Sequence, residues 1–473
     1  MSTITINVMA PLVVGDPADP NNERCQSQWN EFDQHLQAVK VLGVDGVSTD
    51  VWWGLIEPSP GVFNWSYYDK LAAHIIKAGL KWVPILSFHQ CGGNIGDNVY
   101  VPVPAWIWGH LAQKSGIADV QAFKYVSEQG NASNEYVSVW ATDLALDRYE
   151  AVMREFQRHF APLAANILEV NISLGPAGEL RYPSYNSHDQ GSGYPTRGAL
   201  QCYSSLARAS LKEYMLEKYG SEAKAAAAWG VRQWQGELIY PPGNVTDFFG
   251  RYDHVNTQFG RDFFDWYTDS LLSHGRKIMT LALQVFSSRG AAFKGIDLGA
   301  KVPGVHWRMG VNKNGHVMLS DRLAELTAGL IRTSLNDWTS DQDGRGYRPI
   351  VSLFKSLQSV RKGTRVVLHF TCLEMPDGGD RPDAFSLAHT LVVWMGEEAR
   401  RQGVTIKGEN ALNWTLVNQS AWDNIRSVLA VPGVNGAYAG LTILRMGDCL
   451  ASQGAYNGLV GTLALNQLKA AAS

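Results

Sequence analysis

The chain has 473 residues, of which 45% are hydrophobic and 18% charged, so it can bury a large core and is not disordered. The formal net charge is -3, so the chain has no excess of basic residues of the kind that nucleic-acid-binding proteins carry, and no nucleic-acid partner is expected. No segment approaches the roughly 18 consecutive apolar residues of a membrane-spanning helix, so no membrane partner is expected.

The chain begins with a segment that reads as a strand rather than as a signal peptide. Its five cysteines are scattered and form no CxxC pair, which argues against a disulfide framework or a structural zinc site. We therefore expect free thiols and a cytoplasmic or other intracellular location, with a secreted mature form as the alternative. A monomer without metal or cofactor is expected.

Short β-rich runs alternate with amphipathic helices along the whole chain. The helix after the first run carries Trp29, Phe32, Leu36 and Val39 on one face. The predicted runs cover residues 4–12, 44–53, 81–91, 166–174, 297–307, 365–375, 404–408 and 436–445. Later helices are predicted near 143–164, 384–402, 421–429 and 456–472, with a mostly helical insertion at 181–295.

Eight runs, each followed by helix, predict an α/β fold of the (β/α)8 TIM-barrel type, with residues 1–473 as a single domain. An open doubly wound sheet is the alternative, but no GxGxxG motif follows an early run. The connections after the third, fourth and fifth runs are longer than the others. We expect them to form a smaller lobe over the carboxyl-terminal face of the barrel.

Active sites of such barrels lie at the carboxyl-terminal ends of the strands. Polar or ionisable residues stand at or after the ends of seven predicted runs, often beside tryptophan. They are Asp50, His89, Asp97, Glu179, Lys301, His306, Thr371, Glu409, Asn410 and Arg445. A purely structural barrel end does not require this convergence.

Glu179 and Glu409 follow the fourth and seventh runs, which lie across the barrel from each other. Cleavage of a glycosidic bond requires one carboxyl group as acid and a second as base or nucleophile on the other face of the sugar. An isolated glutamate is more often part of a salt bridge. The flanking glycines favour a ligand site, because they let backbone approach a ligand closely.

Residues 89–97 contain three glycines and suggest a mobile lid in which Gly93 and Gly96 act as hinges. A phosphate loop is less consistent, since the GK[ST] ending is missing. The segment gives little support for a metal site, because no second cluster of ligand residues accompanies it. An ordinary glycine-rich surface loop is the remaining alternative.

These residues lie in segments that resemble the β-amylase family. The segments are DVWWG at 50–54, HQCGGNIGD at 89–97, GPAGELRYPSY at 175–185, VPGVHW at 302–307, FTCLEM at 370–375 and GENAL at 408–412. They occur in family order and span nearly the whole chain. The resemblance implies hydrolysis of α-1,4-glucosidic bonds in starch-type glucans, with release of β-maltose from non-reducing ends and inversion at the anomeric carbon.

The resemblance also implies residue roles. Glu179 would be the general acid and Glu409 the general base that activates water. Lys301 and His306 would hold the sugar on the leaving side. The full set of implied sugar-binding residues is Asp50, His89, Asp97, Lys301, His306, Thr371, Asn410, Ala411, Leu412 and Arg445.

The chain departs from the family pattern in three respects. One is the pair Asn413-Trp414 after Glu409, so we expect the surface near the base to differ from that of plant members. No β-rich module like a starch-binding domain follows the last predicted helix, which favours soluble glucans and maltooligosaccharides as substrates. Glu57 is present, but residues 58–61 supply no second carboxylate for a calcium site, so no metal is predicted. A catalytically silent glucan-binding regulator of the same fold is the alternative function, and a retaining barrel glycosidase is a second one.

Overall fold

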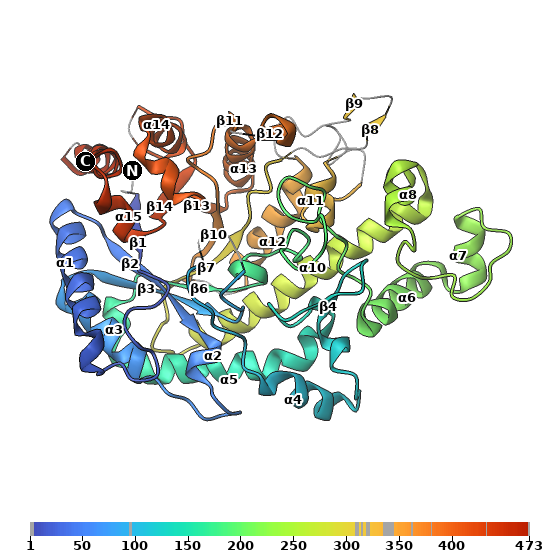
Figure 1. Ribbon diagram of the computed structural model, residues 1–473, viewed down its shortest axis with the longest axis horizontal. Helices are drawn as coiled ribbons and strands as arrows, with labels where there is room; N and C mark the ends of the chain where they lie inside the picture. The colour runs from blue at the N-terminus through green and yellow to red at the C-terminus, as the bar shows by residue number, and fades with distance from the viewer. Residues whose placement is uncertain are drawn as a thin grey trace.

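The computed structural model describes residues 4–93, 97–307, 312–313, 316–317, 322–333, 345–360, 363–379, 381–431 and 433–471. Eight parallel strands close into one barrel in the order β1-β14-β13-β10-β7-β6-β3-β2 (Figure 1). They are β1 Thr5–Met9, β2 Gly46–Trp52, β3 Lys81–Ser87, β6 Glu169–Ile172, β7 Asp297–Val302, β10 Val366–Phe370, β13 Thr405–Glu409 and β14 Tyr438–Ile443. The predicted (β/α)8 barrel is confirmed.

A long helix follows each barrel strand and packs on the outside of the barrel. These helices are α1 Gln26–Leu42, α3 Ser66–Lys77, α5 Thr142–Phe160, α10 Gln258–Phe286, α12 Arg348–Gln358, α13 Ala388–Gln402, α14 Gln419–Val428 and α16 Gln453–Ala471. In α1 the buried side chains are the four predicted from helical spacing, Trp29, Phe32, Leu36 and Val39. Gly43 ends this helix in the left-handed conformation, which glycine adopts without a steric penalty.

Further helices and strands lie in the connections between these elements. The helices are α2 Trp53–Ile56, α4 Trp106–Ser115, α6 Ser205–Tyr219, α7 Glu222–Ala228, α8 Val245–Gly250, α9 Asp253–Asn256, α11 Leu323–Thr327 and α15 Met446–Ala451. The strands are β4 Tyr125–Val126, β5 Ala132–Ser133, β8 Asn312–Lys313, β9 His316–Val317, β11 Asp377–Gly378 and β12 Ser386–Leu387. No helix among the described residues is long and apolar enough to cross a membrane.

Several predicted strands are shorter in the structure than in the sequence pattern. The run at 81–91 contains a strand only to Ser87, and the run at 297–307 only to Val302. The remaining apolar residues belong to loops that pack against the barrel, and alternation of apolar residues alone does not distinguish the two. As a result, His89 and His306 lie in loops beyond the strand ends.

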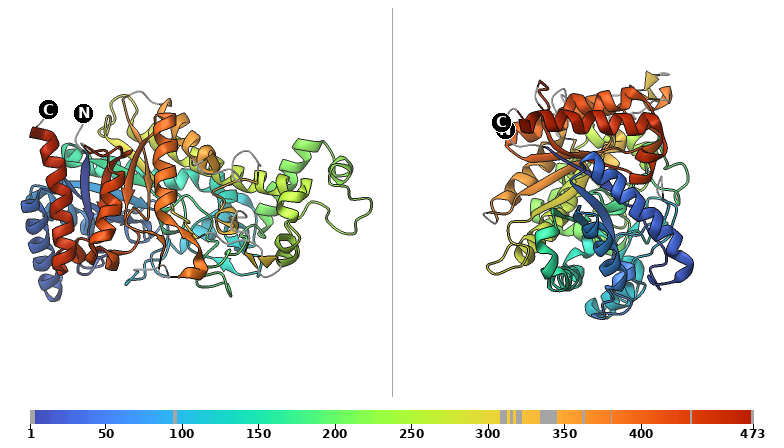
Figure 2. Two further views of the ribbon diagram at one scale, coloured as in Figure 1. Left: turned by 90° about the horizontal axis from the view of Figure 1, so that it is seen from above. Right: turned by 90° about the vertical axis from the view of Figure 1, so that its left-hand side faces the viewer.

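The three longest connections follow β3, β6 and β7, at residues 88–168, 173–296 and 303–365. They contact one another, as shown by the hydrogen bonds from Tyr203 N to Val126 O at 3.0 Å and from Tyr182 N to Ala328 O at 3.1 Å. Within the second connection, α6, α7 and α8 extend away from the barrel as an arm, to the right in Figure 1 and in the left view of Figure 2.

Candidate active site

A tight turn after β6 presents Glu179 at the carboxyl-terminal edge of the barrel. Ala177 and Gly178 adopt positive φ angles of 54° and 80° in this turn. A Cβ at Gly175 would lie 2.5 Å from the carbonyl oxygen of Glu179, so only glycine fits there. The amide of Leu180 then donates to the carbonyl of Lys301 at 2.8 Å, which attaches the turn to β7.

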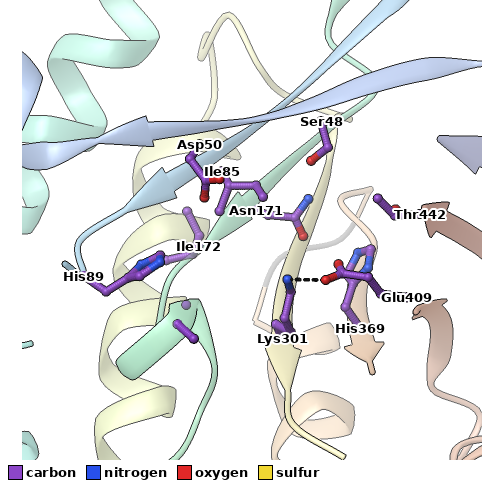
Figure 3. A pocket seen from close by; sticks show the side chains of 12 residues that line it. Ser48, Asp50, Ile85, His89, Asn171, Ile172, Lys301, His369, Glu409 and Thr442 are labelled. Atoms are coloured by element: carbon purple, nitrogen blue, oxygen red, sulfur yellow. Dashed lines mark hydrogen bonds and ion pairs between the residues drawn. The ribbon is translucent and has the colours of Figure 1, made fainter. Parts of the chain in front are cut away.

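Glu409 is the last residue of β13, and its side chain is paired with Lys301 of β7. The Nζ–Oε1 distance is 2.7 Å. A Cβ at Gly408 would lie 1.9 Å from Leu373 Cδ2, so the absence of a side chain allows close packing beside Glu409. Figure 3 shows Lys301 and Glu409 pointing toward one another, with Asp50 and His89 across the pocket.

The electrostatic environment of Glu179 favours its protonated form. Burial raises the pKa of the Glu179 carboxyl above its usual value, although Arg181 and Lys301 act in the opposite direction. The nearby Glu409 adds to the increase. Burial alone would lower the pKa of Lys301, but Glu409 and the other carboxylates raise it, so its ammonium stays charged.

Asp50 and His89 form the opposite wall of the pocket. Ser87 Oγ donates to Asp50 Oδ1 at 2.8 Å, and His89 Nδ1 lies 2.8 Å from Ser173 Oγ. Burial, with Lys301 and Arg181 nearby, lowers the pKa of His89 to about 3, so its ring is neutral. Burial raises the pKa of Asp50. Both side chains can hydrogen-bond an uncharged ligand.

Asp97 is folded back onto its own loop, where Gly92 N donates to Asp97 Oδ2 at 2.8 Å. Gly93 has a positive φ of 101°. The predicted lid covers residues 89–97, and its centre, including the predicted hinge at Gly96, lies outside the described residues.

Thr371 and His306 are tied to neighbouring loops. Gly304 N donates to Thr371 Oγ1 at 2.8 Å. His306 Nδ1 lies 2.8 Å from Ser386 Oγ, and its ring is 5.8 Å from that of Tyr194. These contacts join the connections after β6, β7 and β10 at one side of the pocket.

The segment after Glu409 is held by a buried carboxyl group. Glu374 Oε1 accepts hydrogen bonds from Ala411 N at 3.0 Å and from Leu412 N at 2.7 Å. Leu444 N donates to Asn410 Oδ1 at 2.8 Å, and Asn410 Nδ2 donates to Leu444 O at 3.0 Å. Arg445 Nη1 donates to Ala10 O at 3.3 Å. The chain after β13 is therefore fixed from two sides.

One pocket, with a cavity volume of about 180 Å³, collects most of the predicted site residues. His306 and Leu412 are not among the side chains that line it. Its lining includes Asp50, His89, Asp97, Glu179, Lys301, Thr371, Glu409, Asn410, Ala411 and Arg445. A smaller space below it, in the barrel interior, is lined by Ser48, Asn171, His369 and Thr442 together with Lys301 and Glu409.

Two residues that the sequence reasoning left without a role support the two central carboxyl groups. Arg181 Nε donates to Glu179 Oε2 at 2.8 Å, and Glu374 holds the chain beside Glu409. Both belong to motifs quoted for the family resemblance. A charged residue that lies within two residues of a predicted site residue, as Arg181 does beside Glu179, is a signal that could have drawn attention to Arg181.

The chemistry of the described residues gives no candidate metal site. They contain no group of three or more His, Cys, Asp or Glu side chains that could hold an ion. Glu57 is buried and accepts hydrogen bonds from Trp53 Nε1 at 2.6 Å and Gly61 N at 2.7 Å, with Arg148 Nη1 at 3.9 Å. Its carboxylate is thus engaged by protein donors.

A (β/α)8 barrel with two carboxyl groups facing one pocket at its carboxyl-terminal mouth has the features of a glycoside hydrolase. A family model described as glycosyl hydrolase family 14 matches residues 13–470. The chain belongs to this family, that of the β-amylases.

The relatives that match include β-amylases from bacteria and plants. A thermophilic β-amylase of Thermoanaerobacterium thermosulfurigenes is 34% identical over 93% of this chain and 72% of its own length. The chloroplastic β-amylase 2 of Oryza sativa subsp. japonica is 34% identical over 88% of this chain and 69% of its own length. The crystal structure of the catalytic domain of β-amylase from Paenibacillus polymyxa matches with a TM-score of 0.78 and 32% identity, covering 97% of both chains.

Proposed function

We propose that this chain hydrolyses α-1,4-glucosidic bonds of starch-type glucans and releases β-maltose from non-reducing ends with inversion at the anomeric carbon. The observation that carries the proposal is the arrangement of two carboxyl groups in one pocket, Glu409 buried and Glu179 mostly buried, in a chain of glycosyl hydrolase family 14. Each group has a different cationic neighbour, Arg181 for Glu179 and Lys301 for Glu409.

In this proposal Glu179 is the general acid. Its raised pKa favours the protonated form that a general acid requires. Glu409 is the general base, and the Lys301 ammonium at 2.7 Å stabilises its negative charge. The base takes a proton from water as the water attacks the anomeric carbon. The acid gives its proton to the glycosidic oxygen as that bond breaks.

The remaining lining residues would bind the sugar units. Asp50, His89 and Asp97 would contact the non-reducing end, and Lys301 and His306 the leaving side. Thr371, Asn410, Ala411, Leu412 and Arg445 would complete the binding surface. The barrel interior closes the bottom of the pocket, which supports attack on chain ends rather than on the middle of a glucan.

NMR analysis of the fresh product anomer on soluble starch tests this proposal in the wild type, Glu179→Gln and Glu409→Gln. We expect β-maltose from the wild type and a loss of about 10²–10⁴-fold in each variant, the usual contribution of a general acid or base. An α-anomer product would contradict inversion. Absence of product from all three proteins, with glucan binding retained, would instead indicate a silent glucan-binding regulator.

We further infer that the protein works in a reducing, intracellular compartment. All five cysteines are free, and four of them are buried. Thiol titration of protein taken directly from cells, before and after denaturation, tests this: five reactive thiols are expected after denaturation.

A further inference from the structure

The contact between Arg181 and Glu179 joins one specific nitrogen of the guanidinium group to one specific oxygen of the carboxyl group. Arg181 Nε donates to Oε2 of Glu179 at 2.8 Å, and Arg181 is only 2% exposed. No hydrogen bond from the described residues reaches Oε1 of Glu179. Arg181 is absent from the residues that line the pocket, so it acts on the carboxyl group from behind.

The guanidinium group is itself held in place by its surroundings. Its Cζ lies 4.1 Å from the centre of the Tyr185 ring, and its Nη1 donates to the Tyr182 carbonyl at 3.2 Å. Burial alone would lower the pKa of Arg181, but Tyr185, Glu179 and Glu135 raise it. Arg181 therefore stays charged and cannot accept a proton from Glu179.

We propose that Arg181 is a positioning residue that fixes which oxygen of Glu179 carries the acid proton. This inference rests on the proposed role of Glu179 as general acid. Because Arg181 has only donors, Oε2 must face it as an acceptor, and the proton is confined to Oε1. During the reaction this proton passes to the glycosidic oxygen, which also receives the electron pair of the breaking bond. The resulting carboxylate is stabilised by the charge-assisted hydrogen bond from Arg181.

The charged groups around Glu179 determine the expected pH dependence. Arg181 and Lys301 favour its carboxylate form, whereas burial and Glu409 favour the protonated form. Removing the Arg181 cation should raise the pH at which Glu179 loses its proton. The alkaline limb of the kcat/KM profile should therefore move upward by about one pH unit.

The test compares Arg181→Met and Arg181→Lys on two substrates with different leaving groups. Maltopentaose has a sugar oxygen as leaving group and needs proton donation. In α-maltosyl fluoride the leaving group is fluoride, which departs with little proton donation, and water completes the reaction to maltose and hydrogen fluoride. For Arg181→Met we expect a loss of kcat of about 10²-fold on maltopentaose, less than 10-fold on the fluoride, and KM within about 3-fold of wild type.

Arg181→Lys keeps the charge but not the Nε contact, so its alkaline limb should remain close to that of the wild type while kcat on maltopentaose falls. This variant keeps the test decisive if Arg181→Met does not fold. Tyr185→Phe is the matched control, because it retains the ring beneath the guanidinium. It should leave unchanged both the ratio of kcat values on the two substrates and the alkaline limb of the kcat/KM profile.

Two outcomes separate this inference from the function on which it rests. Equal losses on both substrates with an unmoved alkaline limb in Arg181→Met would overturn the positioning role. Glu179→Gln is assayed alongside and should lose activity on maltopentaose far more than on the fluoride. If Glu179→Gln were as active as wild type on maltopentaose, the acid assignment itself would be wrong.

Discussion

At the scale of single residues, the carboxyl groups in and beside the pocket differ in the hydrogen-bond donors and cations that they contact. Glu179 has one arginine contact and a raised pKa, and Glu409 is paired with a partly buried lysine, Lys301. Glu374 is fully buried and has no cationic partner among the described residues. It accepts only backbone amides, and burial raises its pKa to about 7.

Glu374→Gln tests this environment through stability. A carboxyl group whose pKa rises from 4.5 to about 7 on folding stabilises the folded state below pH 4.5, and this contribution is lost as the pH rises through 7. Relative to the glutamine variant, the wild type should therefore lose ~3 kcal/mol of unfolding free energy across this window. Urea denaturation of both proteins at several pH values measures the difference. A difference that is constant with pH would contradict the raised pKa.

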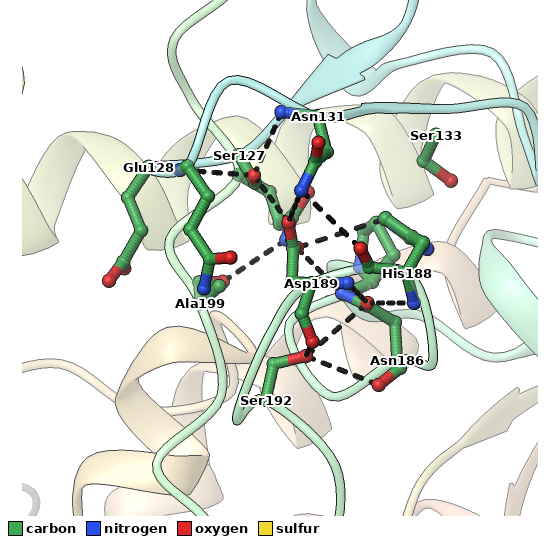
Figure 4. A network of polar contacts seen from close by, with 12 residues as sticks. Ser127, Glu128, Asn131, Ser133, Asn186, His188, Asp189, Ser192 and Ala199 are labelled. Carbon is green, nitrogen blue, oxygen red and sulfur yellow. Dashed lines mark hydrogen bonds and ion pairs between the residues drawn. The ribbon is translucent and has the colours of Figure 1, made fainter.

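At the scale of elements, the loop that follows Glu179 is attached to the β4–β5 hairpin through Asp189, whose side chain is fully buried. Its Oδ1 accepts from Ser127 Oγ at 2.7 Å and Asn131 Nδ2 at 2.8 Å (Figure 4). Its Oδ2 accepts from Asn186 Nδ2 at 2.9 Å and Gln201 Nε2 at 3.1 Å. This network joins the connections after β3 and β6. The anchored loop includes Tyr185, which contacts Arg181.

Asp189→Asn should destabilise the protein by about 2–3 kcal/mol, because the amide nitrogen of asparagine would face donor groups on one side. KM should also rise, since this loop includes Tyr185, which contacts Arg181 behind the pocket. Although burial alone would raise the pKa of Asp189, its four hydrogen bonds lower it below 3.8. Its contribution to stability is thus present above pH 3.8 and lost as the pH falls through the lowered pKa.

Urea denaturation and steady-state kinetics measure both effects. Asp383→Asn is the matched control, because its carboxylate is largely exposed and pairs with the neighbouring Arg381. It should leave stability and KM unchanged. Equal behaviour of the two variants would show that the Asp189 network does not support the site.

At the scale of the whole molecule, the barrel interior contains a charged cluster instead of a fully apolar filling. Glu169 of β6 contacts His369 Nε2 of β10 and lies 2.6 Å from Lys407 Nζ of β13. All three side chains are buried. Burial alone would raise the pKa of Glu169, but His369 and Lys407 lower it well below its usual range. The cluster connects three strands just below the pocket.

Glu169→Gln should cost about 3–5 kcal/mol of unfolding free energy, because it leaves the Lys407 ammonium buried without a charge partner. Replacing Glu169, His369 and Lys407 together by leucine should cost less than this single change, since no buried charge then remains. Urea denaturation midpoints compare the three proteins. A triple variant less stable than Glu169→Gln would show that the cluster contributes net stability.

Much of this molecule follows from local sequence pattern. The period of the apolar residues predicts the buried face of α1, and the alternation of runs and helices predicts the barrel. The polar residues at strand ends are predictable because all parallel strands of a barrel open at the same face. The loop positions of His89 and His306 were not predictable, since apolar loop residues that pack on the barrel resemble strand residues.

The sequence by itself determined the fold class, the family and the set of polar residues at the barrel mouth, because each depends on spacing within short segments. The tertiary structure alone decided which charges meet. Glu409 is 108 residues from Lys301, and Glu169 is 200 and 238 residues from its two partners. Such pairs form only when the barrel closes, and the burial that then shifts the pKa of Glu179 and Glu374 is a property of the closed barrel and its loops.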